Sequence, residues 1–450
     1  MDNTGILTRA EIESLGPPMP EELDETGLSE EFLSELTLKH VASMANPTTR
    51  KVAAKLRLPH VLAELLLHHL RREKLIEIRS QGRESQFAML EQGRERLRHL
   101  HKQSAYVGPA PVPLADYNQM MRLQAAPFRA ASMETVRAAF RDLVLPESLL
   151  QTLGCVINSR SSLFLTGQPG TGKTAVSMRM NKALFGFIWV PYAIEVDGQI
   201  IRVFDSHCHR EVPGKESATD HDRRWVEIER PLIIVGGELT LENTDLAWSE
   251  AAGCYEAPLQ LKSNGGTLVI DDFGRQRVEA QDLLNRWIMP LERFVDFLTL
   301  HNGRKIEVPF EQLMIFSTNF DEKDLVDEAF LRRMGYRVRL EPPRSEAYAE
   351  ILKRAAARRG IILDQGCIEY VLRKYSTEAR QMKSCEPRDL LNRVSEICHF
   401  EGSQQRFTPE LIDLAWRHYF GSSHDFDSDK ARPVTQATVT ETHPRRLERR

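Results

Sequence analysis

The amino-acid sequence predicts an α/β protein built around a parallel sheet with helices on both faces. Between residues 160 and 340, short apolar runs alternate with helical patterns, which is typical of strands joined by crossover helices. One of these runs leads through a glycine-rich loop into a helix. Two others end in Asp or Asn, so that polar groups directly follow buried strands.

Composition limits the class of protein. The chain has 450 residues, of which 41% are hydrophobic and 28% are charged, so it can form two or three domains with cores of their own. The longest apolar runs are shorter than a membrane span, and the acidic N-terminus does not resemble a signal peptide. The six cysteines form no C-x-x-C pair, which favours reduced thiols. We therefore expect a cytoplasmic protein with no transmembrane segment.

Charge is distributed unevenly over the first hundred residues. Residues 1–35 carry ten Asp and Glu against one Arg, together with three prolines. We expect residues 1–29 to be a disordered acidic arm. Residues 36–102 carry 14 Lys and Arg against six Asp and Glu, a net charge of +8. The opposite charges would allow the two segments to interact.

Residues 30–105 are predicted to form a small domain in which three helices precede a hairpin and a closing helix. The expected bounds are Glu30–Met44, Thr48–Leu56 and His60–Glu73, then strands at 75–79 and 86–90 around a turn at 81–83, then Gly93–His101. This order resembles a winged helix-turn-helix domain. The outward positions expected on the third helix are His60, Ala63, Glu64, Leu67 and Arg71, a poor set for reading base edges.

Composition also divides the rest of the chain. Residues 106–129 have prolines at alternate positions 109, 111 and 113, which favours an extended connector. We expect the α/β core over residues 130–340. Residues 344–420 are nearly all helical in pattern, and we expect a separate α-helical lid over residues 341–420. Residues 421–450 are polar with a basic end, and we expect a disordered tail.

The glycine-rich loop is the most informative motif. It fits G-x-x-x-x-G-K-[ST], the phosphate-binding loop of nucleotide triphosphatases, and has a short strand before it and a helix after it. The expected nucleotide-binding residues are Gly167, Gln168, Pro169, Gly170, Thr171, Gly172, Lys173 and Thr174. Backbone amides at the helix N-terminus would face the phosphates. Lys173 would reach the β and γ phosphates, and the Thr174 hydroxyl would bind Mg²⁺.

Two later strands end in groups that suit hydrolysis. Residues 265–272 form an apolar run ending in Asp271 and Asp272. We expect Asp271 to hold Mg²⁺ and Asp272 to polarise the water that attacks the γ phosphate. Residues 313–319 form a second apolar run, and its terminal Asn319 could orient that water. Taken alone, the acid pair could begin a solvated loop and the Asn could be a turn residue.

Three arginines complete the predicted catalytic set. Arg332 and Arg333 end a short helix about a dozen residues after Asn319. One of them, with Arg333 the first choice, would reach the γ phosphate bound by a neighbouring subunit. A pair of arginines at a helix end is otherwise a solvated terminus. Arg388 opens a helix of the predicted lid and could reach the same phosphate.

The sequence thus contains five elements: the glycine-rich loop, the acid pair, Asn319, the arginine pair and Arg388. In this order and spacing they resemble the AAA+ ATPases over roughly residues 130 to 420. The resemblance implies ATP and Mg²⁺ as cofactors and a homo-oligomeric ring, often a hexamer, with sites between subunits. The sequence departs from the family at Asp272, where Glu is usual. The side chain is one methylene shorter, so slow hydrolysis or a differently held water is expected.

Two insertions bear on the branch of the family. Residues 185–265 separate the first core helix from the acidic strand, and they contain a hairpin that turns at Asp197-Gly198. A second hairpin over 297–308 turns at Asn302-Gly303. Such insertions resemble the MoxR-like and related helix-2-insert ATPases, which have chaperone-like activity. Residues 261–274 are also similar to enhancer-binding activators of the sigma-54 polymerase, but their Gly-Ala-Phe-Thr-Gly-Ala loop is absent. Loops 236–241 and 300–304 either grip a partner or pack between subunits.

The sequence thus favours an ATPase that remodels a protein partner recruited through residues 30–105. The alternative is a transcription regulator or nucleic-acid remodelling ATPase that grips DNA through the same domain. The charge of +8 and the hairpin residues Arg79 and Arg83 support the alternative, because they could contact phosphates. The apolar third helix favours the protein partner.

Overall fold

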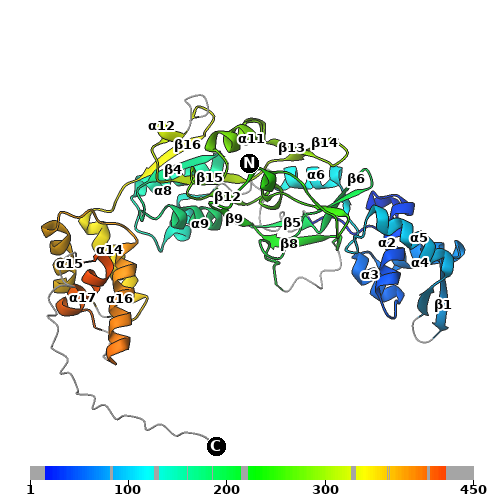
Figure 1. The fold of residues 1–450 in the computed structure, drawn as a ribbon, viewed down its shortest axis with the longest axis horizontal. Helices are drawn as coiled ribbons and strands as arrows, with labels where there is room; N and C mark the ends of the chain where they lie inside the picture. Colours follow the sequence, from blue (N-terminus) through cyan, green and yellow to red (C-terminus); the bar gives the residue numbers. More distant parts are fainter. Residues whose placement is uncertain are drawn as a thin grey trace, which may run out of the picture. The chain divides into compact units, whose positions relative to one another are not determined.

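The computed structural model describes residues 16–81, 85–125, 131–159, 161–184, 186–213, 221–325, 331–361, 363, 365–402 and 406–421. The chain divides into two compact units, residues 1–347 and 348–450, and each is considered by itself. Figure 1 shows the elements of both. No helix in the described ranges is long and apolar enough to cross a membrane.

A five-stranded parallel sheet forms the centre of the first unit, as the sequence predicts. Its strand order is β16-β4-β15-β12-β9. The strands are β4 (Leu163–Gly167), β9 (Leu232–Val235), β12 (Thr267–Ile270), β15 (Leu313–Thr318) and β16 (Tyr336–Leu340). In β4, β12 and β15 every residue is buried, which is why these strands read as continuous apolar runs.

Helices cover both faces of this sheet. Successive residues of a strand point to opposite faces, so Leu163 and Leu165 of β4 pack in one core cluster while Phe164 packs in the other. The first cluster also contains α7 (Met133–Phe140), α8 (Glu147–Ser159) and α9 (Lys173–Ala183). The second contains α11 (Ala280–Arg293), which lies on the other side of the sheet (Figure 1). The predicted α/β fold is therefore confirmed.

The segment treated in sequence as one insertion, 185–265, contains a strand of the core. Leu232–Val235 pairs with β12 as the edge strand of the parallel sheet. The predicted hairpin is present as β6 (Ala193–Val196) and β7 (Gln199–Arg202), and Asp197 and Gly198 have φ values of 51° and 77°, as a tight two-residue hairpin turn requires. The remaining strands are β5 (Phe187–Pro191), β8 (Trp225–Glu229), β10 (Ala247–Ser249) and β11 (Cys254–Glu256). Short helices at Leu241–Thr244 (η2), Leu259–Lys262 (α10) and Glu322–Leu325 (α12) complete the connections.

The second predicted hairpin is also present. It consists of β13 (Val295–Thr299) and β14 (Lys305–Pro309), which pair in antiparallel register around the turn at Gly303. Its buried residues Leu298 and Ile306 pack in the same core as the strands β5 to β8. Both hairpins thus contribute to one hydrophobic core outside the parallel sheet.

The predicted proline-rich connector, 106–129, is not a free linker over its described part. Val112–Pro113 form strand β3, which pairs with β6 at the edge of a second five-stranded sheet of order β10-β11-β7-β6-β3. Helix α6 (Leu114–Ala125) follows at once, and its Tyr117 hydroxyl accepts a hydrogen bond from Asn264 Nδ2 at 2.9 Å. A linker prediction rests on local composition, whereas this strand is created by pairing with residues about eighty positions away.

The N-terminal domain has the predicted order of elements. Its helices are α2 (Glu30–Ser43), α3 (Thr49–Leu56), α4 (His60–Arg72) and α5 (Glu91–Gln103), and its hairpin is β1 (Ile76–Gln81) with β2 (Ser85–Met89). Ser29 and Thr48 cap α2 and α3 by accepting backbone hydrogen bonds. The expected outward face of α4 was wrong at two positions, since Ala63 and Leu67 are fully buried. Val61 and Leu65 are exposed instead, at 63% and 52%.

This domain shares its core with the second sheet. Tyr106 and Ala110 are buried in one cluster with α2, α3 and α4, and the same cluster contains Ala193, Ile200 and Cys254 of the sheet. At Gly253 a Cβ would lie 2.7 Å from Ser104 Cα, so the two backbones approach closely. The domain therefore packs directly against the second sheet rather than being tethered to it.

The predicted disordered arm, 1–29, is wrong over its described part. Asp222 N donates a hydrogen bond to Pro17 O at 2.8 Å, and residues 24–26 form a short 3-10 helix (η1, Asp24–Thr26). The buried Arg224 guanidinium donates to Thr26 O at 2.8 Å and to Pro111 O at 3.1 Å while pairing with Asp222. Hydrogen bonds to this buried, ion-paired cation hold the acidic segment in place. Residues 1–15 lie outside the described ranges.

The second unit is the predicted helical bundle. It contains α14 (Ser345–Ala357), α15 (Gln365–Thr377), α16 (Glu386–Glu401) and α17 (Pro409–Phe420). Its core includes a buried polar chain in which the Tyr348 and Tyr375 hydroxyls lie 2.9 Å apart and Tyr375 donates to Glu386 at 2.7 Å. Of the predicted tail, 421–450, only Gly421 lies within the described residues.

Candidate phosphate-binding site

The glycine-rich loop connects β4 to α9 at the carboxyl edge of the parallel sheet. Gly172 is the N-cap of α9 and has a φ of 98°, in the left-handed region that favours glycine. Gly167 has a φ of 151°, and a Cβ there would lie 2.6 Å from Leu340 O. The loop therefore needs glycine at both ends to reach the start of the helix, where backbone amides are left unpaired.

Lys173 lies in the first turn of α9 with its ammonium group held by three acceptors. Its Nζ donates to Gly167 O at 2.8 Å, to Gln168 O at 3.2 Å and to Asn319 Oδ1 at 2.5 Å. Burial lowers the Lys173 pKa from its usual value, and the nearby carboxylates of Asp271 and Asp272 oppose that shift. The side chain thus carries its charge into a largely buried position at the base of the loop.

Thr174 and Asp271 meet across two elements. The Thr174 hydroxyl donates to Asp271 Oδ2 at 2.7 Å, and Asp271 Oδ1 accepts from the Asp272 amide at 3.1 Å. The two side chains are hard oxygen donors, as Mg²⁺ prefers, and a protein usually supplies only one or two ligands beside the phosphates. The donor set therefore fits Mg²⁺. In the described residues no group of three or more His, Cys, Asp and Glu is placed to hold a metal.

Asp272 and Asn319 face each other from the ends of neighbouring strands. Strands β12 and β15 run parallel with Ile270 beside Phe316, so the residues that follow them emerge side by side. Asn319 Nδ2 donates to Asp272 Oδ1 at 2.9 Å. Because the other end of the same amide accepts from Lys173, Asn319 links the phosphate loop to the acidic strand.

Asp272 has an unusual backbone conformation, with a φ of 48°. Asp tolerates this left-handed region better than most residues, at some cost in free energy. The conformation turns the chain sharply after β12, and Phe273 N then donates to Ser317 O of β15 at 2.7 Å. Strain at a carboxylate in this network is consistent with a functional position.

Gln276 is a member of the site that the sequence did not single out. Its Nε2 donates to Asp271 O at 3.1 Å, to Asp272 O at 3.3 Å and to Gly236 O at 3.4 Å, while its Oε1 accepts from Gly274 N at 2.8 Å. The amide therefore holds the turn that contains Asp272 and ties it to the loop after β9. A single Gln in a polar stretch carries no signal in sequence, because its partners are backbone groups.

Arg333 and Arg332 do not join this cluster. Arg333 Nε donates to Glu292 at the end of α11, and Arg332 is exposed. Both precede β16, whereas the phosphate loop follows β4 in the same parallel pair. The five residues of β16 alone, at about 3.3 Å each, put roughly 15 Å between the two edges of the sheet. Neither arginine lies beside the phosphate loop of its own chain.

Arg388 belongs to the second unit. It lies in the first turn of α16, where its Nε donates to Asp389 at 3.1 Å and its side chain is 66% exposed. An exposed neighbouring pair of this kind contributes little to stability. Arg388 is therefore sterically available for a further contact.

Comparisons with known proteins match parts of the chain. The model of a family described as a domain of unknown function (DUF8689) matches residues 344–418, which include α14 to α17. The chain is similar in structure to the RuvB Holliday junction branch migration motor of Thermotoga maritima, with 14% identity and a TM-score of 0.36 over 61% of this chain and 69% of that one. It is also similar to NtrX from Brucella abortus in complex with ATP, with 15% identity and a TM-score of 0.37 over 59% and 51%. No curated protein matches the sequence.

Proposed function

We propose that this protein is an AAA+ ATPase that binds ATP with Mg²⁺ and hydrolyses it. The observation that carries the proposal is the hydrogen-bonded network at the ends of β4, β12 and β15. It joins Lys173 to Asn319, Asn319 to Asp272, and Thr174 to Asp271. Chance placement would not bring the five predicted polar groups to one edge of the sheet, beside a glycine loop and a helix N-terminus.

A bound nucleotide would replace several of the contacts that the site residues make with one another in the structure. The β and γ phosphates would take the place of the loop carbonyls around the Lys173 ammonium and accept hydrogen bonds from the amides at the start of α9. Thr174 and Asp271 would hold Mg²⁺, which would neutralise charge on the phosphate oxygens. Their mutual hydrogen bond supports this assignment, because it brings the two oxygens within 2.7 Å of each other.

Asp272 would accept the proton of the attacking water. Asn319 keeps the Asp272 carboxylate in place through Oδ1 and leaves Oδ2 for the water. The side chain is one methylene shorter than the Glu usual in the family, so its carboxylate reaches less far. The left-handed backbone at Asp272 also changes the direction in which the side chain leaves the main chain. A general base must lie within hydrogen-bond reach of the water, so we expect the shorter side chain to make turnover slow.

Arg333 would act on a neighbouring subunit. Its position at the amino edge of the sheet, away from its own phosphate loop, is the arrangement expected of an arginine that serves another chain's site. Binding a γ phosphate would require Arg333 to leave Glu292, an exposed pair that costs little to break. This role supports a homo-oligomeric ring, with a hexamer as the usual form of the resembled family. We assign Arg332 as the second choice and Arg388 as a contributor from the lid.

We further propose that the ATPase remodels a protein partner recruited through the N-terminal domain. Val61 and Leu65, four residues apart on α4, are large apolar side chains exposed to solvent, and most DNA contacts are instead hydrogen bonds to phosphates and base edges. They lie on the helix that would enter the major groove in a DNA-binding winged helix. Apolar contacts there would be suited to a protein surface.

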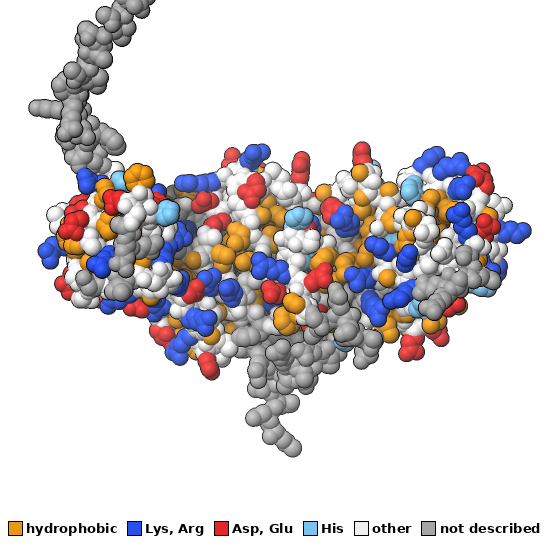
Figure 2. Space-filling model, turned by 90° about the horizontal axis from the view of Figure 1, so that it is seen from below, with side chains coloured by type: hydrophobic (Ala, Val, Ile, Leu, Met, Phe, Trp, Pro, Cys, Tyr) orange, Lys and Arg blue, Asp and Glu red, His pale blue; other side chains and the backbone are white. Residues whose placement is uncertain are grey.

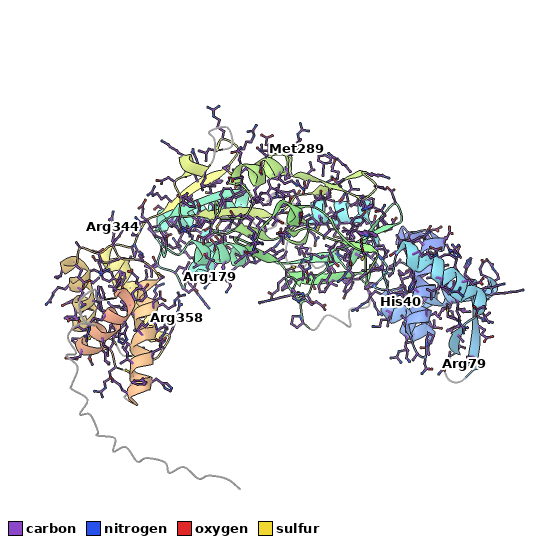
Figure 3. All side chains as sticks on the ribbon, in the orientation of Figure 1. His40, Arg79, Arg179, Met289, Arg344 and Arg358 are labelled. Carbon is purple, nitrogen blue, oxygen red and sulfur yellow. The ribbon has the colours of Figure 1, made fainter. Side chains whose placement is uncertain are left out.

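The alternative is a DNA-binding regulator or nucleic-acid remodelling ATPase. Lys and Arg side chains are prominent on the N-terminal domain, at the right end of Figure 2, in keeping with its net charge of +8 from 14 basic and six acidic residues over 36–102. Arg79 is exposed on the hairpin (Figure 3), where it could contact a phosphate. Phosphate contacts of this kind would be weak and lost as salt rises.

A pull-down decides between the two. The Asp272→Asn variant, held in ATP, should retain its partner because binding is spared while hydrolysis is weakened. The captured material is probed separately for protein and for nucleic acid, with Lys173→Ala as the control that lacks the nucleotide-bound state. Nucleic acid captured in an ATP-dependent manner, with no protein enriched over the control, would promote the DNA alternative.

A further inference from the structure

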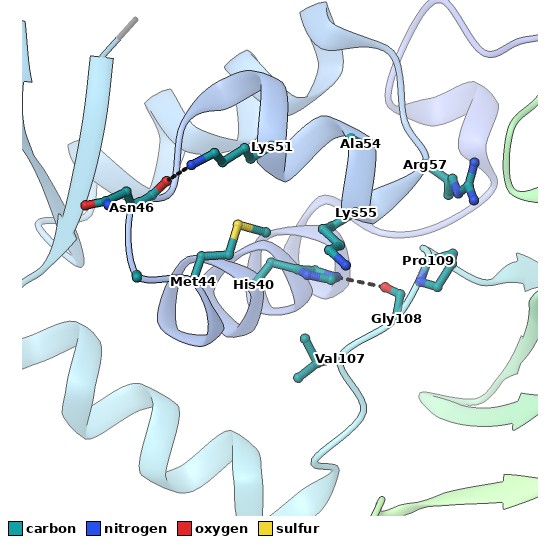
Figure 4. A pocket seen from close by; sticks show the side chains of 11 residues that line it. His40, Met44, Asn46, Lys51, Ala54, Lys55, Arg57, Val107, Gly108 and Pro109 are labelled. Carbon is teal, nitrogen blue, oxygen red and sulfur yellow. Dashed lines mark hydrogen bonds between the residues drawn. The ribbon is translucent and has the colours of Figure 1, made fainter. Parts of the chain in front are cut away.

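A cavity lies at the junction between the N-terminal domain and the segment that leads into the second sheet. It opens to solvent and has a volume of about 800 Å³ between the end of α2, one face of α3 and residues 107–109 (Figure 4). This volume falls in the range of sites that take small ligands or short peptide segments. Its walls include Met44, Lys51, Lys55, Arg57, Val107 and Pro109.

The charge of the cavity is of one sign. Lys51, Lys55 and Arg57 line it, and its lining includes no carboxylate. Lys51 Nζ donates to the backbone oxygen of Asn46 at 3.0 Å, and the Arg57 guanidinium lies over the Tyr192 ring at 5.2 Å. Among the described residues, Lys55 has no hydrogen bond or ion pair. Three cations without an opposing charge favour an anionic occupant.

A buried hydrogen bond joins two walls of the cavity. His40 of α2 is 1% exposed, and its Nε2 donates to Gly108 O at 2.8 Å (Figure 4). Burial lowers the His40 pKa, and repulsion from Lys55 and Lys39 adds to the effect. A neutral imidazole is the form that can serve as a single fixed donor here. This hydrogen bond joins the helical wall to residues 107–109, so the two walls are pre-organised relative to each other.

Away from α3, the lining is largely apolar. Met44 at the end of α2 lines the cavity together with Val107 and Pro109, and Val107 remains 40% exposed. Pro109 follows a segment without regular secondary structure, which leaves its surface free of a neighbouring strand. The cavity thus presents cations on the α3 side and apolar groups on the other.

We propose that this cavity binds an extended segment of a partner protein in which acidic and apolar residues alternate. Lys51 and Lys55 are four residues apart on α3, which places their Cβ atoms about 6 Å apart. Alternate residues of an extended peptide are separated by about 6.6 Å, so two carboxylates on one side of the peptide match the two ammonium groups. The apolar residues between them would face Met44, Val107 and Pro109. The inference rests on the proposed recruitment of a protein by this domain.

The test uses the full chain and a fluorescein-labelled peptide of eight residues that alternates Glu and Leu. Fluorescence polarisation should show saturable binding that weakens as salt rises. A peptide alternating Gln and Leu should bind at least about tenfold more weakly, as should the acidic peptide to a Lys51→Glu/Lys55→Glu variant. That variant should in turn bind a peptide alternating Lys and Leu better than the wild type does.

The matched control is Arg71→Glu/Lys102→Glu, which makes the same change in net charge at two exposed residues of the same domain that do not line the cavity. It should bind the acidic peptide like the wild type, and circular dichroism and ATP turnover should be unchanged in both variants. Equal weakening in both pairs, or equal binding of the Glu and Gln peptides, would overturn the inference. So would displacement of a random DNA duplex by the Lys51→Glu/Lys55→Glu change without any peptide effect. Peptide binding without ATP turnover would leave the cavity assigned and remove the ATPase proposal instead.

Discussion

Asn319 is the residue through which the phosphate loop and the acidic strand are connected. Its side-chain oxygen accepts from Lys173 and its side-chain nitrogen donates to Asp272. The motif in the loop predicted Lys173 and Thr174, and the apolar runs predicted Asp271, Asp272 and Asn319 at strand ends. The hydrogen bonds among them required the strand order, since β4, β15 and β12 are far apart in sequence but adjacent in the sheet.

The first prediction separates binding from turnover. Lys173→Ala should lose nucleotide binding, because its ammonium is the main counter-charge to the β and γ phosphates. Asp272→Asn should keep binding within a few-fold and lose turnover by about a hundredfold or more, as removal of a general base does. Isothermal titration and phosphate release measure the two effects. Near-normal phosphate release from Asp272→Asn would remove Asp272 from the catalytic role.

The second prediction concerns Arg333. Arg333→Ala subunits should fold and bind ATP but hydrolyse it slowly, because the charge they lose acts on the next subunit. Lys173→Ala subunits should have the opposite defect. Rings mixed from the two should recover part of the activity, since some interfaces pair an intact site with an intact arginine.

Arg332→Ala is the matched control for this mixing experiment, because it removes a neighbouring arginine from the same turn. Phosphate release is followed across mixing ratios, with ring assembly checked by size-exclusion chromatography. If Arg333→Ala alone hydrolyses ATP at the wild-type rate as an assembled ring, Arg333 has no such role and Arg332 becomes the candidate.

At the scale of elements, the hydrophobic periodicity and the residue propensities predicted most strands and helices. They did not predict how these elements face one another. Apolar continuity predicted β4, β12 and β15 because they are buried on both faces. The outward face of α4 was misjudged because a helix with apolar residues around most of its circumference gives a weak direction. Strand β9 was hidden within a presumed insertion because its pairing with β12 is not visible in local sequence.

The third prediction tests the turn after β12. Gln276→Met keeps the size of the side chain but removes its hydrogen bonds to Asp271 O and Asp272 O. We expect the affinity for ATP to change little and kcat to fall by about tenfold, because the Asp272 carboxylate loses its support. Steady-state kinetics and nucleotide titration give the two values.

Gln281→Met is the control for that change, because Gln281 lies on α11 and, within the part of the chain that the structure describes, its amide reaches only Asn285, an exposed neighbour at 3.4 Å. Its kinetics should match the wild type. A fall in the unfolding temperature of Gln276→Met with kcat unchanged would show that Gln276 supports the fold and not the reaction.

For the whole molecule, the sequence indicated more separation between parts than the structure has. Composition suggested an arm, a domain and a linker in series. Within residues 16–29, Thr26 instead accepts a hydrogen bond from the buried Arg224. The connector contributes strand β3 to the second sheet. These contacts join positions about eighty to two hundred residues apart, and their stabilisation comes from burial that no local window contains. Deletion of residues 30–105 would therefore expose core residues such as Ile200 and Cys254.

The last prediction measures this shared core by a single added methyl group. In Gly253→Ala the new Cβ would meet Ser104 Cα at 2.7 Å and Ala105 N at 2.8 Å, and the residue has a φ of 55°. Gly198→Ala is the control, because Gly198 has a φ of 77° but nothing within 4 Å of a new Cβ. Both changes carry the backbone penalty of a left-handed alanine, on the order of 1 kcal/mol. Only Gly253→Ala adds the clash, worth about 1–3 kcal/mol more.

Denaturant unfolding followed by tryptophan fluorescence should give a lower free energy of unfolding for Gly253→Ala than for Gly198→Ala. Equal values would mean that the N-terminal domain shifts to accommodate the added methyl group. Its packing against the second sheet would then be less tight than its buried residues indicate.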